Sequence, residues 1–250
     1  MTVNAPAVKW HDGPATPTIS ANEVHVWKVD LSSPLSAELD SVLSADENER
    51  ASRFHFERDR KRFKIAHGSL RMILSGYLEL APAQLTFGQT DYGKPFLTNI
   101  EAAGFLFNMS HSGDLAFIAV ARDREVGIDI ELVRPDFATM EVAEHFFSVA
   151  EIYTLSGLDP HPRIRAFFNC WTRKEAYVKA RGEGLSMPLD QFDVSLAPGV
   201  AAAMLGNRID ESERSRWTLQ NIEVAPNYAG SLVVEALTSE PLVSCFAFAS

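Results

Sequence analysis

The stretch VGIDIELVRP, residues 126–135, places two carboxylates one residue apart inside a segment that is otherwise typical of a buried strand. Successive side chains of a strand point to opposite faces. One face is therefore apolar, with Val126, Ile128 and Ile130. Asp129 and Glu131 stand side by side on the other face. Like charges at that spacing repel each other and raise a pKa unless a cation lies between them.

A hard divalent cation bound by oxygen ligands would relieve this repulsion, and the pair predicts Mg²⁺, with Mn²⁺ as a substitute. Gly127 shares the acidic face and has no side chain, so we expect a ligand to approach the backbone there. The alternative is an edge strand whose acidic face is simply solvated, and the D-x-E pattern alone leaves that alternative open.

The composition is that of a globular protein with a core of its own. The chain has 250 residues, of which 46% are hydrophobic and 22% charged. A formal net charge of -10 argues against a general nucleic-acid binder. No run of about 18 apolar residues suggests a membrane span. We therefore expect a cytoplasmic protein that binds neither nucleic acid nor membrane, with two reduced cysteines.

The pattern of elements predicts two α+β halves, residues 22–124 and 125–250, behind a flexible Pro-rich tail of residues 1–21. The first half begins with an alternating strand over 23–31 and a segment of helical spacing over 33–54, capped by Ser33 or by Ser36. A long helix over 57–79 follows.

Three strands with tight turns then cover residues 105–132. The second half repeats this plan. We expect a helix near 139–155 and a longer one over 163–181, followed by strands at FDVSL, WTLQNIEV and GSLVVEAL, with VSCFAFA as a further candidate. Two such halves in one chain predict a pseudo-duplicated architecture.

Basic residues gather in one segment of this acidic chain. Residues 50–71, RASRFHFERDRKRFKIAHGSLR, hold eight Arg or Lys against two acids. The segment is a candidate anion site and could help to attract an acidic partner. The alternative is an amphipathic helix with a solvated charged face.

A second set of polar residues lies on the long helix expected in the second half. Trp171, Glu175 and Lys179 recur every four residues and form one stripe, whereas Lys174 is displaced by about 100° around the axis. Glu175 would add a third carboxylate to the acidic pair, and the two lysines would supply cations for a phosphate. Without the acidic strand, the same pattern would indicate only an i,i+4 ion pair on a surface helix.

The segment NMSHSG, residues 108–113, places a hydroxyl and an imidazole at the end of a strand. Ser110 and His111 are adjacent and point to opposite faces, so they cannot easily act as a nucleophile and its base. The sequence also lacks a G-x-S-x-G motif. A serine hydrolase is therefore disfavoured.

The order YGKP, NMSHSG, VGIDIE and FFNCWTRKEAYVKARGEGL resembles the 4'-phosphopantetheinyl transferases of the longer, surfactin-synthetase-activating type. The resemblance covers residues 44–196. It implies two α+β halves related by a pseudo-twofold axis with the active site between them. It also implies a monomeric, Mg²⁺-dependent enzyme that moves the phosphopantetheine arm of coenzyme A to a serine of an apo acyl or peptidyl carrier protein and releases 3',5'-ADP.

The resemblance assigns roles to residues of this chain. The implied metal ligands are Asp129, Glu131 and Glu175. Glu175 would also accept the proton of the carrier serine, and Lys179 and Lys174 would lie near the phosphates. The other implied coenzyme A contacts are Ser110, His111 and Lys94 with Gly93, and Arg50, Arg53 and Arg62 at the 3'-phosphate. Where members often carry a lysine before Arg50, this chain has Asp46, Glu47 and Asn48.

Two functions of other classes remain open at the level of sequence. A non-catalytic module could bind coenzyme A or a carrier protein, with its acids merely solvated. A metal-dependent phosphohydrolase could release free phosphopantetheine without any carrier. Magnesium-dependent release of 3',5'-ADP separates the transferase from the module, and a requirement for the carrier separates it from the hydrolase.

Overall fold

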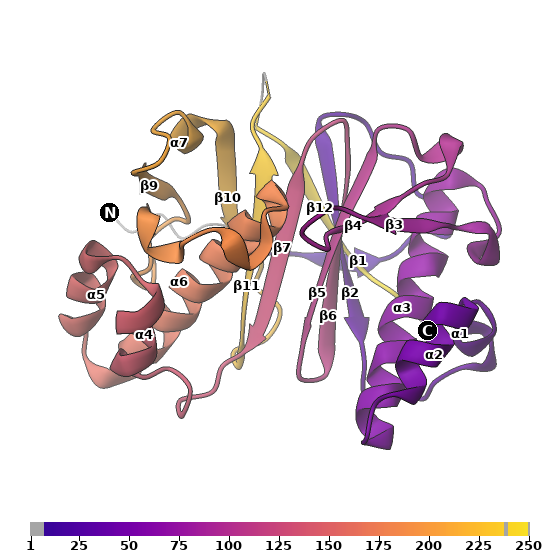
Figure 1. The fold of residues 1–250 in the computed structure, drawn as a ribbon, viewed down its shortest axis with the longest axis horizontal. Helices are drawn as coiled ribbons and strands as arrows, with labels where there is room; N and C mark the ends of the chain where they lie inside the picture. Colours follow the sequence, from indigo (N-terminus) through magenta and orange to yellow (C-terminus); the bar gives the residue numbers. More distant parts are fainter. Residues whose placement is uncertain (1–7, 238–239, 250) are drawn as a thin grey trace.

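The computed structural model describes residues 8–237 and 240–249. Helices cover the two outer sides of the molecule and β-sheets lie in the middle (Figure 1). Each side is dominated by one long helix, α3 (Glu57–Leu78) or α6 (Pro160–Arg181), and each of these helices has 22 residues. The fold is therefore α+β with two similar halves, as the sequence predicts.

The first half is built on a five-stranded sheet with the order β1-β12-β2-β6-β5. Its strands are β1 (Trp10–Asp12), β2 (Glu23–Asp30), β5 (Phe105–Ser112), β6 (Leu115–Arg122) and β12 (Leu242–Ala247). The helices α1 (Ala37–Ser41), α2 (Ala45–Ser52) and α3 belong to this half, with the hairpin β3 (Phe87–Gln89) and β4 (Pro95–Leu97) and the short turns η1 (Pro82–Gln84) and η2 (Ile100–Ala102).

The second half contains a three-stranded antiparallel sheet with the order β10-β11-β7. Its strands are β7 (Val126–Leu132), β10 (Trp217–Asn221) and β11 (Tyr228–Glu235). A small pair, β8 (Phe192–Val194) and β9 (Met204–Asn207), lies beside it. The helices are α4 (Met140–Phe146), α5 (Val149–Ser156), α6 and α7 (Glu213–Arg216), with η3 (Gly184–Ser186) and η4 (Leu189–Gln191).

Three apolar layers hold these elements together. One lies between α3 and the first sheet, one between the two sheets, and one between the second sheet and α6. The apolar face of β7 belongs to the middle layer, where Val126, Ile128 and Ile130 are fully buried. This confirms the alternation inferred from the sequence, and it turns the acidic face of β7 toward α6.

The two chain ends differ from the expectation. Residues 10–12 are not part of a flexible tail, because β1 pairs with β12, and Trp10 stacks on Phe117 with ring centroids 5.6 Å apart. Residues 1–7 lie outside the described part of the chain. The strand β12 pairs in turn with β2, so the last strand belongs to the sheet of the first half. A division at residues 124 and 125 therefore does not separate the two sheets.

Two segments expected as single helices each form two helices, and a serine, Ser44 or Ser148, caps the second helix of each pair. The segment 33–54 forms α1 and α2, and Ser36 rather than Ser33 caps α1 by accepting the Leu39 amide at 3.2 Å. The segment 139–155 forms α4 and α5, because Phe147 is extended and Ser148 begins a new helix with a capping box. In the described part of the chain, no helix combines the length and apolarity that crossing a bilayer requires.

Candidate functional site

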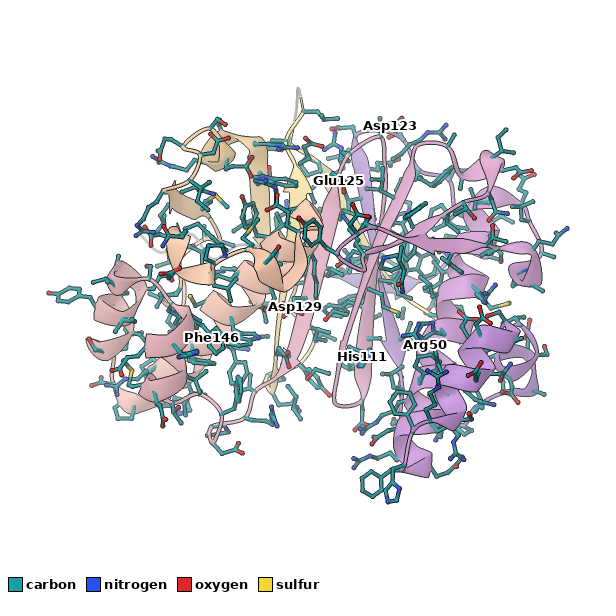
Figure 2. The ribbon with its side chains drawn as sticks, in the orientation of Figure 1. Arg50, His111, Asp123, Glu125, Asp129 and Phe146 are labelled. Carbon is teal, nitrogen blue, oxygen red and sulfur yellow. The ribbon has the colours of Figure 1, made fainter. Side chains whose placement is uncertain are left out.

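A cavity of about 380 Å³ lies where β5 of the first half meets β7 and α6 of the second. Its lining comprises Met109, Ser110 and His111 from β5, Asp129 and Glu131 from β7, and Trp171, Glu175 and Lys179 from α6. Figure 2 shows His111 and Asp129 near the middle of the molecule, on the two sides of this junction. The structure therefore brings together the three predicted carboxylates, Lys179, Ser110 and His111, and we call this cavity the acidic pocket.

Gly127 allows α6 to lie directly on β7. A Cβ atom at Gly127 would be 2.1 Å from the Ala176 carbonyl oxygen and 2.4 Å from the Ala180 amide nitrogen. The expectation that a ligand approaches the backbone at Gly127 is therefore wrong, because α6 occupies that space. The close packing places the stripe of Glu175 and Lys179 against the acidic face of β7.

Asp129 is the most deeply buried of the three carboxylates, with 2% of its surface exposed. Its Oδ1 accepts hydrogen bonds from Ser110 Oγ at 2.8 Å and from Lys179 Nζ at 2.6 Å. Its Oδ2 is buried and has no hydrogen-bond partner among the described residues. A buried, unsatisfied carboxylate oxygen is costly, so this atom is available to a cation.

The other two carboxylates titrate above their ordinary range. Burial raises the pKa of Glu175 above 4.5, and the nearby charge of Asp129 raises it further. Burial also raises the pKa of Glu131 and outweighs the hydrogen bond that its Oε2 accepts from Ser112 Oγ at 2.7 Å. Both shifts show that the acidic pocket disfavours a second and a third negative charge.

The donor set of the pocket fits a hard divalent cation in its chemistry. Three carboxylates line it, one buried oxygen lacks a partner, and two pKa values are raised by burial and mutual repulsion. Within residues 8–237 and 240–249, however, no three acidic, His or Cys side chains are already gathered as closely as metal ligands. Asp129 is paired with Lys179 instead.

Lys174 is not part of the acidic pocket, so the structure does not bring it together with the other residues predicted to lie near the phosphates. Its side chain is completely buried, and its Nζ contacts Glu151 Oε2 at 2.8 Å. The same ammonium donates to the carbonyl oxygens of Leu189 at 2.7 Å and Phe192 at 2.6 Å. The displacement of about 100° from the stripe therefore points Lys174 into the second half, where it joins α6 to α5 and β8.

Lys94 lies at the other end of β7. Its Nζ donates to Glu125 Oε2 at 2.7 Å and to the Ala180 carbonyl oxygen at 3.0 Å. Glu125 precedes β7 and is well separated from Asp129 in Figure 2. Lys94 thus connects the β3–β4 hairpin to the C-terminal end of α6, and the structure does not bring its ammonium into the acidic pocket.

The three arginines assigned to the 3'-phosphate lie in different surroundings. Arg62 bonds to Asp114 in the turn after β5. Loss of hydration lowers the pKa of His111, and the charges of Lys179, His67 and Arg62 lower it further, in that order. Arg50 is exposed and lies over the Phe63 ring, with 5.4 Å between its guanidinium carbon and the ring centroid. Arg53 is exposed and pairs with Glu49.

Sequence reasoning missed two polar residues beside the pocket, Asn108 and Ser112. Both lie on the same face of β5 as Ser110, and both donate or accept hydrogen bonds across the junction with β7. Their signal was present as the alternation N-x-S-x-S at residues 108–112, polar at every second position of a strand.

Comparison with known proteins agrees with this geometry. Residues 125–233 match the family described as "4'-phosphopantetheinyl transferase superfamily". Residues 31–123 match "4'-phosphopantetheinyl transferase, N-terminal". The first match begins two residues after the second one ends, and neither includes the last strand of the chain, β12.

Individual relatives extend over more of the chain. It is 41% identical to "4'-phosphopantetheinyl transferase HetI" of Nostoc sp., over 93% of this chain and 96% of the relative. It is 32% identical to "4'-phosphopantetheinyl transferase Sfp" of Bacillus subtilis, over 68% and 76% of the two chains. A solved holo-[acyl-carrier-protein] synthase of Thermotoga maritima shares 20% identity, with a TM-score of 0.36 over 44% of this chain and 62% of that one.

Proposed function

We propose that this chain, which belongs to the 4'-phosphopantetheinyl transferase superfamily, transfers the phosphopantetheine arm of coenzyme A to a serine of an apo carrier protein. The observation that carries the proposal is the acidic pocket, where β5, β7 and α6 bring three carboxylates, a lysine, a serine and a histidine around one cavity. Carboxylates suit a hard divalent cation, and the lysine and hydroxyl suit the phosphate oxygens that such a cation would neutralise.

The reaction joins the serine oxygen to the phosphorus that carries pantetheine. The bond from that phosphorus to the bridging oxygen of the pyrophosphate breaks, and 3',5'-ADP leaves with the bonding electrons. The serine proton passes to a base. Phosphoryl transfer of this kind asks the protein for orientation and electrostatic stabilisation rather than for a covalent intermediate.

Glu175 is the residue that we assign to the serine proton. It lines the pocket, and burial together with the charge of Asp129 raises its pKa. A base is most effective when its pKa approaches the working pH, so this shift favours the role. Lys179 donates to Asp129 and to Ser110 at 2.9 Å, and we expect it to balance the negative charge of the phosphates.

Asp129, Glu131 and Glu175 would hold the Mg²⁺ ion, with Mn²⁺ as a substitute. The ion would neutralise charge on the pyrophosphate oxygens of the bound coenzyme A. Ser110 and His111 line the same cavity from the first half and would contact the phosphates. Arg62, which lies near His111, would reach the 3'-phosphate, and Arg50 and Arg53 would contribute from α2 and its C-terminal end.

A second cavity of about 310 Å³ shares Glu175 with the acidic pocket and extends along α6. Its lining includes Phe146, Val178 and Met187. We propose that this less polar space receives the pantetheine chain or the segment around the carrier serine. The residues around the acidic pocket come from both halves of one chain, which favours a monomer as the active unit.

The test is release of 3',5'-ADP from coenzyme A in the presence of Mg²⁺, with and without an apo carrier protein, and with EDTA as a control. The proposal predicts release only when both Mg²⁺ and the carrier are present. Release without a carrier would identify a phosphohydrolase. Binding of coenzyme A without release on any of several acyl and peptidyl carriers would identify a non-catalytic module.

A further inference from the structure

The two halves meet along β5 and β7 through side chains. In the described sheets, β5 pairs only with β6, and β7 pairs only with β11, so each presents a free edge to the other. Asn108 Oδ1 accepts the Ile128 amide at 2.8 Å. An unpaired buried amide is costly, so this contact completes an edge that backbone pairing leaves open.

Two serines continue the same pattern with a constant offset of twenty residues. Ser110 Oγ accepts the Ile130 amide at 3.4 Å, and Ser112 Oγ accepts the Leu132 amide at 3.1 Å. Alternate residues of β5 therefore cap alternate amides of β7. Because side chains at every second position share a face, this arrangement fixes the register of the two strands.

The serines differ from Asn108 because they also donate to carboxylates of the acidic pocket. Ser110 donates to Asp129 and itself lines the cavity. Ser112 does not line the cavity, and it donates to Glu131 Oε2 at 2.7 Å. A serine hydroxyl has one proton and can accept two hydrogen bonds. At Ser112 that proton is committed to Glu131, while the Leu132 amide fixes the position of the oxygen.

We propose that Ser112 is a positioning residue for Glu131. Its hydroxyl ties one carboxylate oxygen to the backbone of β7 and directs the other, Oε1, toward the bound cation. The described residues offer no hydrogen-bond donor to Oε1. This inference rests on the proposed function, because it gives Glu131 a metal ion to bind. Hydrogen-bonding partners of metal ligands commonly change metal affinity by about 10- to 100-fold.

The experiment measures Mn²⁺ binding by electron paramagnetic resonance with saturating coenzyme A, no carrier, and a protein-free coenzyme A blank. Ser112→Ala should raise the dissociation constant for Mn²⁺ by about tenfold or more. Ser112→Thr keeps a hydroxyl and should bind Mn²⁺ nearly as tightly as the natural protein. Ser112→Cys, with a similar volume and a weak donor, replaces the alanine variant if that variant does not fold.

Asn108→Ala is the matched control, because it removes an amide cap at the same junction without touching a carboxylate. It should lower the melting temperature but leave Mn²⁺ affinity unchanged. Unaltered affinity in Ser112→Ala, or equal losses in Ser112→Ala and Asn108→Ala, would overturn the inference, and so would a natural protein that binds no Mn²⁺. A natural protein that binds Mn²⁺ but modifies no carrier would instead contradict the proposed function and leave the inference standing.

Discussion

The long helix of each half, α3 or α6, is joined to the preceding short helix by the same kind of ion pair. The two long helices differ in the neighbouring stripe of side chains. In the first half, Ser44 and Glu47 form a capping box at the start of α2, and Glu47 pairs with Arg71 of α3 at 2.7 Å. In the second half, Ser148 and Glu151 form a capping box at the start of α5, and Glu151 pairs with Lys174 of α6.

The two basic residues occupy equivalent places. Arg71 is the fifteenth residue of α3 counted from Glu57, and Lys174 is the fifteenth of α6 counted from Pro160. Glu47 lies in the segment where the resemblance leads us to expect a lysine. Burial alone would raise the pKa of its carboxyl group. Hydrogen bonds from His67, the Ser44 amide and Arg71 outweigh burial and lower the pKa of Glu47 to about 2. Lys174 is thus the counterpart of a structural arginine.

The stripe one position further along separates the halves. Where α6 carries Trp171, Glu175 and Lys179, the equivalent positions of α3 hold Gly68, Met72 and Gly76. A Cβ atom at Gly68 would be 2.7 Å from the Leu39 carbonyl oxygen, and one at Gly76 would be 2.7 Å from that of Ala15. The first half therefore uses this stripe for close packing of backbone, and only the second half uses it for chemistry.

The largest expected effect is a loss of turnover when Glu175, the sixteenth residue of α6, is changed. A change at the same position of α3, Met72, is the control. Glu175→Gln keeps the size of the side chain but removes a base and a metal ligand, so carrier-dependent 3',5'-ADP release should fall by at least about 100-fold. Met72→Leu, at the equivalent position of α3, should leave turnover unchanged. Near-normal activity of Glu175→Gln would remove Glu175 from the mechanism and with it the contrast between the halves.

The next effect is on the free energy of unfolding, and it distinguishes Lys174 from Lys179 on α6. Lys174→Met leaves the Glu151 carboxylate buried and unpaired, so the free energy of unfolding should fall by about 3–5 kcal/mol in urea titrations. Below its melting temperature this variant should still turn over. Lys179→Met should show a smaller loss of stability and a large loss of turnover, because the Lys179 side chain is 28% exposed and Ser110 still donates to Asp129. Equal turnover losses in both variants would restore Lys174 to the phosphate site.

These lysines show how far the sequence could predict the site. The stripe on α6 and the two faces of β7 follow from local periodicity, so the sequence alone predicts that Glu175, Lys179, Asp129 and Glu131 gather at one site, and all four line the acidic pocket. The partner of Lys174 lies 23 residues earlier in the sequence, on α5, and no local pattern joins the two. The role of Gly127 and the placement of β12 in the first sheet also depend on contacts between distant segments.

A smaller effect concerns coenzyme A recognition by the first half. Arg62→Ala should raise the KM for coenzyme A by about tenfold or more, because a charge-assisted hydrogen bond contributes about 1.5–3 kcal/mol. The KM for 3'-dephospho-coenzyme A should not change. Arg58, which is exposed on the same helix and contacts Asp59, provides the control in Arg58→Ala. An equal rise for both substrates would exclude a contact between Arg62 and the 3'-phosphate.

The smallest effect is the pH dependence of stabilisation by Mg²⁺. The raised pKa values of Glu131 and Glu175 mean that both are protonated at low pH, where they neither repel Asp129 nor bury a charge. As the pH rises through those values they become charged, and their contribution to stability is lost. Mg²⁺ should therefore raise the melting temperature by a few degrees at pH 7.5 and by much less near pH 4.5. A shift that is independent of pH would indicate a cation site elsewhere.

The most direct test is intact-mass analysis of apo carrier proteins after incubation with coenzyme A and Mg²⁺, using the natural protein, Glu175→Gln and Lys174→Met. We predict that the natural protein and Lys174→Met add one phosphopantetheinyl group to a carrier serine, and that Glu175→Gln adds none. Modification by Glu175→Gln, or no modification of any carrier by the natural protein, would contradict this prediction.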